Sequence, residues 1–409
     1  MNLDKESKVK HISFLLGSGF SIPDGYPPTS QINNRLEEID QNEIHIHTSG
    51  SAWFLNGQED RNAWSRTEQK LFVQRFLEFY NKEVIPGEEF NYEKFYDYYS
   101  ELRRTNNLNE KCRKFFNNFR KESDQEYDHY NFLLNFHDTF SQLLASLLSI
   151  KWPEPVSLLR PYQRNYSEFL ELLDDLGKEF KVHIHTLNHD LLMEKFAHTE
   201  TLGNKMSDGF EEYGSPFYGY HTLWKGENPV AHYTVRLRRF TNEFSRQFCL
   251  YKLHGSIDQY VFNYDNKEYT TIKLLYGISN HELFKEIKND TGELEYYRGH
   301  TEVYPDFLSG TSTKILNYDR QVYYKPIFNH FLNNLKNSQV LIVIGYGFGD
   351  TKINEFIENN FLSDSGKKMI VIDVKKPSNP LVDKENVILI LNSISDIISS
   401  EITRVIKKN

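Results

Sequence analysis

The chain has 409 residues, of which 39% are hydrophobic and 26% charged, and it carries a formal net charge of −9. This is the composition of a folded protein long enough for a large core, and its acidic balance gives no reason to expect direct nucleic-acid binding. Two cysteines exclude a disulfide framework and a four-cysteine zinc ribbon, and no run approaches the ~20 apolar residues that cross a bilayer.

The chain begins with a charged segment, residues 1–10, that contains no apolar signal sequence, so a cytoplasmic protein without membrane association is expected. Residues 10–16 are predicted to be a strand, and the mainly apolar run Ile12-Ser-Phe-Leu-Leu16 within it is typical of a strand buried on both faces of a parallel sheet. The run ends in Gly17-Ser-Gly-Phe-Ser21. Glycines there let the backbone approach a ligand, and the amides around Gly17 and Gly19 could line a diphosphate, with the Ser18 and Ser21 hydroxyls as further donors.

A largely helical block follows this first strand. Residues 40–165 carry apolar side chains at three- and four-residue spacing, the period of an amphipathic helix. We therefore expect an inserted helical subdomain over residues 40–165, with the core formed by residues 1–39 and 166–409.

Strands and helices alternate in the rest of the chain. Further strands are predicted at residues 182–187, 248–254, 339–344, 369–374 and 386–391. This alternation predicts the α/β class, with a Rossmann-like, doubly wound parallel sheet and no zinc ribbon. Residues 199–247, with many Gly, Pro and Tyr, are expected to be an irregular insertion in the core. Residues 258–330 are expected to be a second irregular insertion, in which short strand-like runs such as Tyr269–Tyr276 alternate with loops.

Two polar motifs follow the ends of predicted strands. In Thr186-Leu-Asn-His-Asp190, Asn188 and Asp190 can point into one crevice at the carboxyl end of a strand, although Asp190 could simply cap the next helix. In Lys252-Leu-His-Gly-Ser256, His254 is a candidate general base, although a lone histidine is more often structural.

A second glycine turn, Gly345-Tyr-Gly-Phe-Gly-Asp350, repeats the arrangement of the first. Two such turns predict one nucleotide held between strand ends, with Gly345 and Gly347 in its binding site. Asp350 is expected to cap the helix that follows. Asp373 ends the next strand, the usual place for a carboxylate that binds ribose hydroxyls, and an ordinary loop position is the alternative.

Two His-x-His pairs, His45/His47 and His183/His185, suggest a metal site, because alternate residues of a strand face the same side. No third ligand lies at a helpful spacing, so no metal site is predicted.

Together these segments resemble the sirtuin family, and specifically the zinc-free sirtuin-like NAD hydrolases of bacterial antiphage defence. Gly17-Ser-Gly-Phe-Ser21 with Ile22-Pro-Asp24 is similar to the family's Gly-Ala-Gly-x-Ser…Ile-Pro-Asp loop, and Thr186-Leu-Asn-His-Asp190 to its Thr-Gln-Asn-Ile-Asp motif. Leu253-His-Gly-Ser256 matches the catalytic His-Gly. The chain departs from the family in lacking the zinc cysteines and the arginine after Ile-Pro-Asp-Phe, and in having Leu187 before Asn188.

The resemblance implies that NAD+ is the substrate and that no zinc is bound. It places the diphosphate on Gly17–Gly19 and the adenosine end toward Gly345 and Asp373. Asp190, with Asp24, would hold the nicotinamide carboxamide.

It also implies a chemical step in which Asn188 positions the ribose and a water molecule while His254 accepts a proton. The products would be nicotinamide and ADP-ribose or a cyclic form, and the loss of NAD+ would serve antiphage defence. Members of this kind form homo-oligomers, sometimes with a separately encoded HerA-type ATPase as partner.

Other functions remain open from the sequence. A sensor or scaffold that binds an ADP-ribose nucleotide without turnover would tolerate loss of His254. An NAD-dependent protein deacylase would need a wall for its acyl-lysine groove, which the zinc module usually supplies. A metal-dependent hydrolase would require the histidine pairs.

Overall fold

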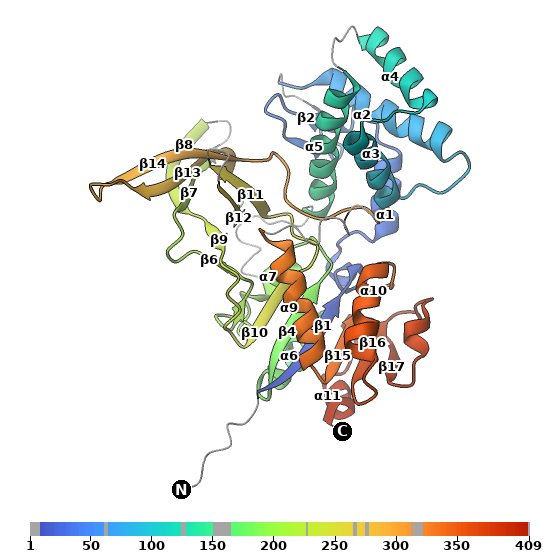
Figure 1. The fold of residues 1–409 in the computed structure, drawn as a ribbon, viewed down its shortest axis with the longest axis vertical. Coiled ribbons are helices and arrows are strands. Elements are labelled where there is room, and N and C mark those ends of the chain that lie inside the picture. The colour runs from blue at the N-terminus through green and yellow to red at the C-terminus, as the bar shows by residue number, and fades with distance from the viewer. Residues whose placement is uncertain are drawn as a thin grey trace.

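The computed structural model describes residues 9–60, 64–123, 128–149, 165–225, 228–264, 268–274, 278–311, 314 and 322–407. A parallel sheet with helices on both faces forms its base, and two insertions lie above the carboxyl ends of the strands (Figure 1). One insertion is mainly helical and the other is an antiparallel sheet.

The central sheet has seven strands in the order β17-β16-β15-β1-β4-β10-β5, and all their pairings are parallel. The strands are β1 (Lys10–Leu16), β4 (Phe180–Thr186), β5 (Met206–Ser207), β10 (Phe248–Lys252), β15 (Val340–Ile344), β16 (Lys368–Asp373) and β17 (Val387–Leu391). From β1 the sheet continues outward through β4 and β10 to the short edge strand β5, and from β15 it continues the other way through β16 and β17. The order therefore reverses between β1 and β15, which is the topological switch point of a doubly wound sheet. The predicted α/β fold class is confirmed.

The lack of alternation in β1 arises because both faces of the sheet are covered. Ile12, Phe14 and Leu16 pack into a core with helices α6 (Ser167–Gly177) and α11 (Ser399–Lys407). Leu15 points the other way, into a core with helices α9 (Tyr324–Asn337) and α10 (Thr351–Ile357). A short helix, α7 (Leu192–Phe196), follows β4.

The helical insertion has a core of aromatic rings. Its helices are α1 (Thr29–Glu37), α2 (Thr67–Phe79), α3 (Tyr92–Thr105), α4 (Glu110–Ser123) and α5 (His129–Leu148). Phe76 contacts Phe95 and Phe136, with ring centroids 5.7 and 5.0 Å apart, and all three rings are fully buried. The insertion also contains a short hairpin, β2 (Ile44–Ile46) and β3 (Ala52–Phe54), which helical spacing did not predict.

The described parts of residues 199–247 and 258–330 are more regular than predicted, although the strand-like run expected from residue 269 does coincide with a strand. Both contribute strands to one eight-stranded sheet in the order β6-β9-β12-β11-β14-β13-β7-β8. The strands are β6 (Phe210–Glu211), β7 (Phe217–Lys225), β8 (Asn228–Arg236), β9 (Arg238–Phe240), β11 (Gln259–Tyr264), β12 (Glu268–Lys273), β13 (Ile278–Lys288) and β14 (Leu294–Thr301). Many side chains of this sheet are exposed, so it lacks the clean apolar alternation of a half-buried strand.

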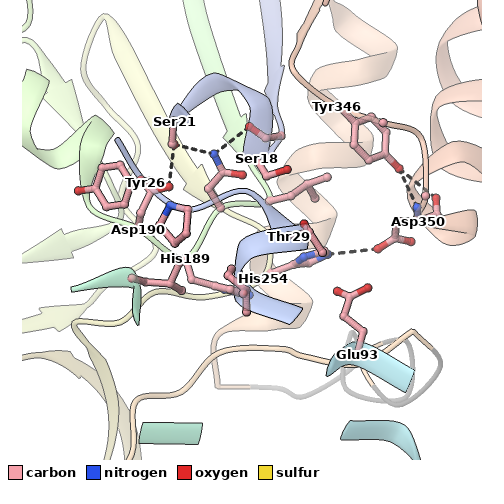
Figure 2. A pocket seen from close by; sticks show the side chains of 18 of the residues that line it. Ser18, Ser21, Tyr26, Thr29, Glu93, His189, Asp190, His254, Tyr346 and Asp350 are labelled. Atoms are coloured by element: carbon pink, nitrogen blue, oxygen red, sulfur yellow. Dashed lines mark hydrogen bonds and ion pairs between the residues drawn. The ribbon is translucent and has the colours of Figure 1, made fainter. Parts of the chain in front are cut away.

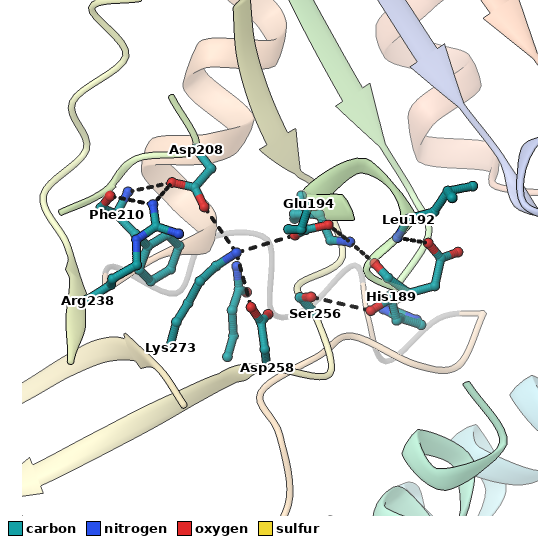
Figure 3. Close-up of polar contacts among 12 residues, drawn as sticks. His189, Leu192, Glu194, Asp208, Phe210, Arg238, Ser256, Asp258 and Lys273 are labelled. Atoms are coloured by element: carbon teal, nitrogen blue, oxygen red, sulfur yellow. Dashed lines mark hydrogen bonds and ion pairs between the residues drawn. The ribbon is translucent and has the colours of Figure 1, made fainter. Parts of the chain in front are cut away.

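A buried charge cluster joins this sheet to the core (Figure 3). Lys273 of β12 lies 3.3 Å from Glu194 of α7, 3.1 Å from Asp208 and 3.2 Å from Asp258. Arg238 of β9 also pairs with Asp208. Burial alone would lower the pKa of Lys273, but the three carboxylates outweigh it and raise that pKa above its usual value. Lys273 therefore keeps its charge, and its ion pairs fix the sheet on the core.

Within the described ranges, no helix is both long and apolar enough to cross a membrane.

Candidate functional site

A cavity of about 320 Å³ opens at the switch point, where the strand ends meet the helical insertion (Figure 2). Both glycine turns line it, through Gly17 and Gly347, as do Asn188 and His254 from the ends of β4 and β10. The crevice outside the carboxyl ends at a switch point is the general ligand site of open α/β sheets. The motifs chosen from the sequence therefore meet in one place.

The two glycine turns pack directly against each other. The Gly19 amide donates to the Gly345 carbonyl over 2.9 Å, and the Gly17 amide donates to the Ile344 carbonyl over 3.0 Å. A Cβ on Gly17 would lie 2.6 Å from the Gly345 oxygen, and Gly345 itself has a φ of +61°. These glycines thus allow two backbones to meet at the switch point. In contrast to the prediction, the amides of Gly17 and Gly19 bind the neighbouring turn and do not face the cavity.

Asn188 and Asp190 are connected through the hydroxyl of Ser21. Asn188 Nδ2 lies 3.0 Å from Ser21 Oγ, which in turn lies 2.7 Å from Asp190 Oδ2. Because a carboxylate only accepts, Ser21 donates its hydrogen to Asp190 and must accept from the amide of Asn188. The same amide donates to the Gly17 carbonyl over 2.9 Å.

This network sets the orientation of the Asn188 side chain. With both donors directed at Ser21 and Gly17, the carbonyl oxygen Oδ1 is the side-chain atom left to a ligand, and it forms no hydrogen bond with any described residue. Asp190 also accepts from the amide of Leu192, the first residue of α7, over 3.0 Å. The Asp190 side chain therefore has two positions of interest. It accepts a hydrogen bond at the start of α7, close to the capping role that was the alternative interpretation, and it also lines the cavity.

The His254 ring lies against the carboxylate of Asp350 inside the cavity. Their Nε2 and Oδ2 atoms are 3.4 Å apart, and both side chains are more than nine-tenths buried. Asp350 also accepts from the amides of Lys352 and Ile353, which confirms that it caps α10. Asp350 therefore belongs to the site as well as to the helix, a role that its sequence position did not suggest.

The ionisation of this pair follows from its surroundings. Burial lowers the pKa of His254, and the positive charge of Lys314 lowers it further against the opposing effect of Asp350. Burial would raise the pKa of Asp350, but the hydrogen bond from His254 and the charge of Lys314 outweigh it and hold that pKa well below its usual range. The pair is therefore a neutral imidazole beside an ionised carboxylate.

Two charged residues from outside the core complete the cavity. Lys314 lies 3.2 Å from Asp350 and 3.6 Å from Glu93 of α3. Burial raises the pKa of Glu93, and Lys314 opposes that effect. Neither Glu93 nor Lys314 was predicted from the sequence, because no local motif marks them and only the packing of the insertions brings them to the core.

Four predicted binding residues do not line this cavity: Gly19, Asp24, Gly345 and Asp373. Asp24 is buried and pairs with Lys195 over 3.4 Å. Asp373 ends β16 and accepts from the Lys375 amide over 3.3 Å. Ser18 and Ser21 do line it (Figure 2), and the Ser21 hydroxyl, predicted as a donor to a diphosphate, donates to Asp190 in this structure.

The histidine pairs have other partners. His183 contacts His11 over 2.9 Å and Tyr251 over 3.2 Å, and burial lowers the pKa of His183 to about 3. His45 lies 2.9 Å from Asp60. Among the residues that the structure describes, no group of three histidine, cysteine or acidic side chains is placed to hold a metal ion.

Comparison with known proteins identifies the family. The model of the SIR2-like domain matches residues 182–390, just over half of the chain. The chain therefore belongs to the SIR2-like domain family, which confirms the sirtuin-like resemblance of its motifs. The matched region contains Asn188, Asp190, His254 and the second glycine turn.

No curated protein matches the chain. Similar solved structures include a Sir2 homologue–NAD complex, with 12% identity over 98% of this chain and 91% of that one and a TM-score of 0.36. Another, described as the structural basis of sirtuin substrate affinity, has 11% identity over 100% and 99% of the two chains and a TM-score of 0.38. At these TM-scores the likeness adds nothing to the family assignment.

Proposed function

We propose that the protein is an NAD+ glycohydrolase that cleaves the nicotinamide–ribose bond. One observation carries this proposal: two groups line the same switch-point cavity. They are the Asn188 carbonyl oxygen, which has no hydrogen bond to a described residue, and a neutral His254 held by a carboxylate. Membership of the SIR2-like domain family and the sirtuin-type motifs support NAD+ as the ligand.

The bond that breaks joins the ribose C1′ to the nicotinamide nitrogen, and its electron pair leaves with the neutral nicotinamide. The transition state has oxocarbenium character, as in other glycosidic cleavages. The Asn188 oxygen accepts a hydrogen bond from the ribose or from the attacking water, and its partial negative charge favours the developing cation. Water forms the new C1′–O bond and gives up a proton, so the products are nicotinamide, ADP-ribose and H+.

His254 accepts that proton. Donation from its Nε2–H to Asp350 makes Nδ1 the nitrogen with the lone pair and stabilises the imidazolium once it forms. Asp350 remains ionised because it is also held by Lys314 and by the start of α10. Attack by a ribose or base atom of the same molecule, in place of water, would give a cyclic ADP-ribose.

The volume of the cavity supports placing the reacting end of NAD+ in it. About 320 Å³ is at the lower end of small-molecule sites, so we place the nicotinamide and its ribose inside. Asp190 lines this part and is the group proposed to bind the carboxamide. The diphosphate and adenosine then extend past Gly347 toward the ends of β15 and β16, where Asp373 lies.

We further propose a cytoplasmic defence enzyme that depletes NAD+ on phage infection and works as a homo-oligomer, with a HerA-type ATPase as a candidate partner. The resemblance of its motifs to zinc-free defence members supports this. The contact between Lys314 and Glu93 offers a point of control, because residues of both insertions close the cavity.

The test is incubation of the purified chain with NAD+, alone and with candidate partners, followed by chromatography of nicotinamide, ADP-ribose and cyclic products. The wild type should release nicotinamide, and Asn188→Ala should reduce release about 10²- to 10⁴-fold without changing the melting temperature. Release only with an acyl-lysine peptide would favour a deacylase. Tight NAD+ binding without products in any condition would favour a sensor and contradict the proposal.

A further inference from the structure

A second cavity, also of about 320 Å³, lies between the helical insertion and the antiparallel sheet. Tyr96 and Arg103 of α3 and His137 of α5 form one side. Strand β11 and the segment from Glu302 to Ser309, which leads from β14 toward the helices, form the other. It shares no lining residue with the switch-point cavity, so it is a separate space.

Three polar groups border this cavity: the buried His137, the partly exposed Arg103 and the exposed Glu302. The charge of Arg103 also acts on Asp138, where it opposes the burial that raises the pKa of that carboxyl to about 6. His137 is 4% exposed, and its Nδ1 atom forms no hydrogen bond with any described residue. Arg103 and Glu302, which also line the cavity, form no ion pair within the described part of the chain. Leaving a buried polar atom without a hydrogen bond costs about 1–3 kcal/mol. The unpaired Nδ1 of His137 therefore points to a ligand that supplies its partner, with Arg103 and Glu302 at the same cavity.

The chemistry of the walls narrows the class of ligand. Tyr304 meets His137 edge to face with ring centroids 4.9 Å apart, and Tyr96 meets the same ring at 5.7 Å. Burial lowers the pKa of His137 to about 3, so the ring is neutral and can accept or donate a hydrogen bond. Arg103 supplies a charge suited to a phosphate, and Glu302 accepts hydrogen bonds from hydroxyl or amino groups.

We propose that this cavity is a second ligand site for a mononucleotide, distinct from the NAD+ cleft. The phosphate pairs with Arg103, the base packs against the tyrosine and histidine rings, and the sugar hydroxyls or base amino groups donate to Glu302. The volume suits one nucleotide better than a dinucleotide, because it is at the lower end of small-molecule sites.

The wall of this second site is bonded to the segment that carries His254. The Leu308 amide donates to the His254 carbonyl over 2.7 Å, and Phe307 pairs with Gly255 in an antiparallel bridge. A Cβ on Gly255 would lie 2.4 Å from the Asp306 carbonyl oxygen, so the two segments are in close contact. Occupancy of the second site is therefore coupled to the position of His254. The effect of this coupling on turnover rests on the proposed NAD+ hydrolysis.

Calorimetric titration of the full chain with AMP, adenosine and inorganic phosphate tests the site. AMP should bind more tightly than adenosine or phosphate alone. Arg103→Met should weaken AMP about tenfold or more and remove its advantage over adenosine. Arg104→Met is the matched control, since Arg104 is exposed on the same helix and paired with Glu101 over 2.7 Å. His137→Phe keeps the aromatic packing and should also weaken AMP.

Three outcomes would overturn the site: no binding of AMP, GMP, CMP or UMP at millimolar concentration, equal AMP affinity in Arg103→Met and Arg104→Met, or loss of AMP binding in Asn188→Ala. The last would place AMP in the NAD+ cleft. The coupling has its own readout, the KM and kcat for NAD+ with AMP present. AMP should change them in Arg104→Met and not in Arg103→Met. If the chain releases no nicotinamide, the proposed function and the coupling fail, and the binding titration still decides the site.

Discussion

The switch-point cavity and the charge cluster around Lys273 are both sets of buried charges held by oppositely charged partners, yet they differ in what remains available to a ligand. In the cluster, one ammonium group meets three carboxylates within 3.3 Å. At the switch point, the ion pair between Lys314 and Asp350, with the neutral His254 beside it, borders a cavity of about 320 Å³. A shifted pKa is thus common to a structural and a candidate catalytic site, and the open volume distinguishes them.

The two regions differ further in where an unpartnered acceptor lies: Glu194 Oε2 and Asp258 Oδ1 of the cluster are buried without a hydrogen bond to any described residue, whereas the acceptor of Asn188 borders an open cavity. Asn188 Oδ1 forms no hydrogen bond with the described residues although the donors of the same side chain are fully used. In the cluster, the ammonium group of Lys273 is surrounded by three carboxylates (Figure 3). Substitutions in the cluster should therefore change stability, and substitutions in the cavity should change turnover.

The largest expected effect comes from removing the central charge of the cluster. Lys273→Met leaves Glu194, Asp208 and Asp258 without their shared cation, and breaking a buried ion pair costs about 3–5 kcal/mol in the free energy of unfolding. Denaturant unfolding measures it. Lys288→Met, at an exposed position of β13 in the same sheet, should stay within about 0.5 kcal/mol of the wild type. A stable Lys273→Met protein that has lost only turnover would contradict the structural role of the cluster.

In the cavity, Asp350→Asn should lower kcat for NAD+ cleavage about 10- to 100-fold, because the neutral amide no longer stabilises the imidazolium of His254. Asparagine caps a helix as well as aspartate does, so α10 should persist. Asp128→Asn, the same change at the exposed cap of α5, is the control.

The pH profile gives this variant a second readout. His254 acts as a base when it is neutral, and its lowered pKa places the acid limb of kcat/KM below the usual histidine value of about 6.5. Asp350 opposes that lowering, so Asp350→Asn should move the limb to still lower pH. A limb that moves upward, or does not move, would show that Asp350 does not act through His254.

A smaller effect is expected at Ser21, which positions Asn188 and Asp190 without itself being assigned a chemical step. Ser21→Ala removes two hydrogen bonds and should lower kcat/KM for NAD+ about tenfold. Ser13→Ala is a close control, because Ser13 is buried on β1 and loses a similar bond, to Ser338, away from the cavity. Equal losses of turnover in the two variants would mean that Ser21 has only a structural role.

Sequence patterns predicted the core and part of the site for one physical reason. Parallel strands covered on both faces are continuous apolar runs, and their carboxyl ends meet at one edge, so Asn188 and His254 could be grouped before the fold was seen. The antiparallel sheet was missed because its exposed faces leave no strong apolar alternation.

The rest of the site depends on long-range packing. Glu93 and Lys314 come from different insertions and meet only because both lie above the same strand ends. Asp350 was correctly predicted as a helix cap, but the spacing of residues gave no sign that its second oxygen reaches His254. Likewise, the contact between the glycine turns depends on β1 and β15 being neighbours, which only the strand order reveals.

The most direct test of the central claim is the rate of nicotinamide release from NAD+ by the wild type and by His254→Ala, with NAD+ binding measured on the same samples. We expect the wild type to release nicotinamide, the rate of release to fall about 10²- to 10⁴-fold in the variant, and both proteins to bind NAD+. Equal release by the two proteins, or NAD+ binding without release by the wild type under every condition, would contradict it.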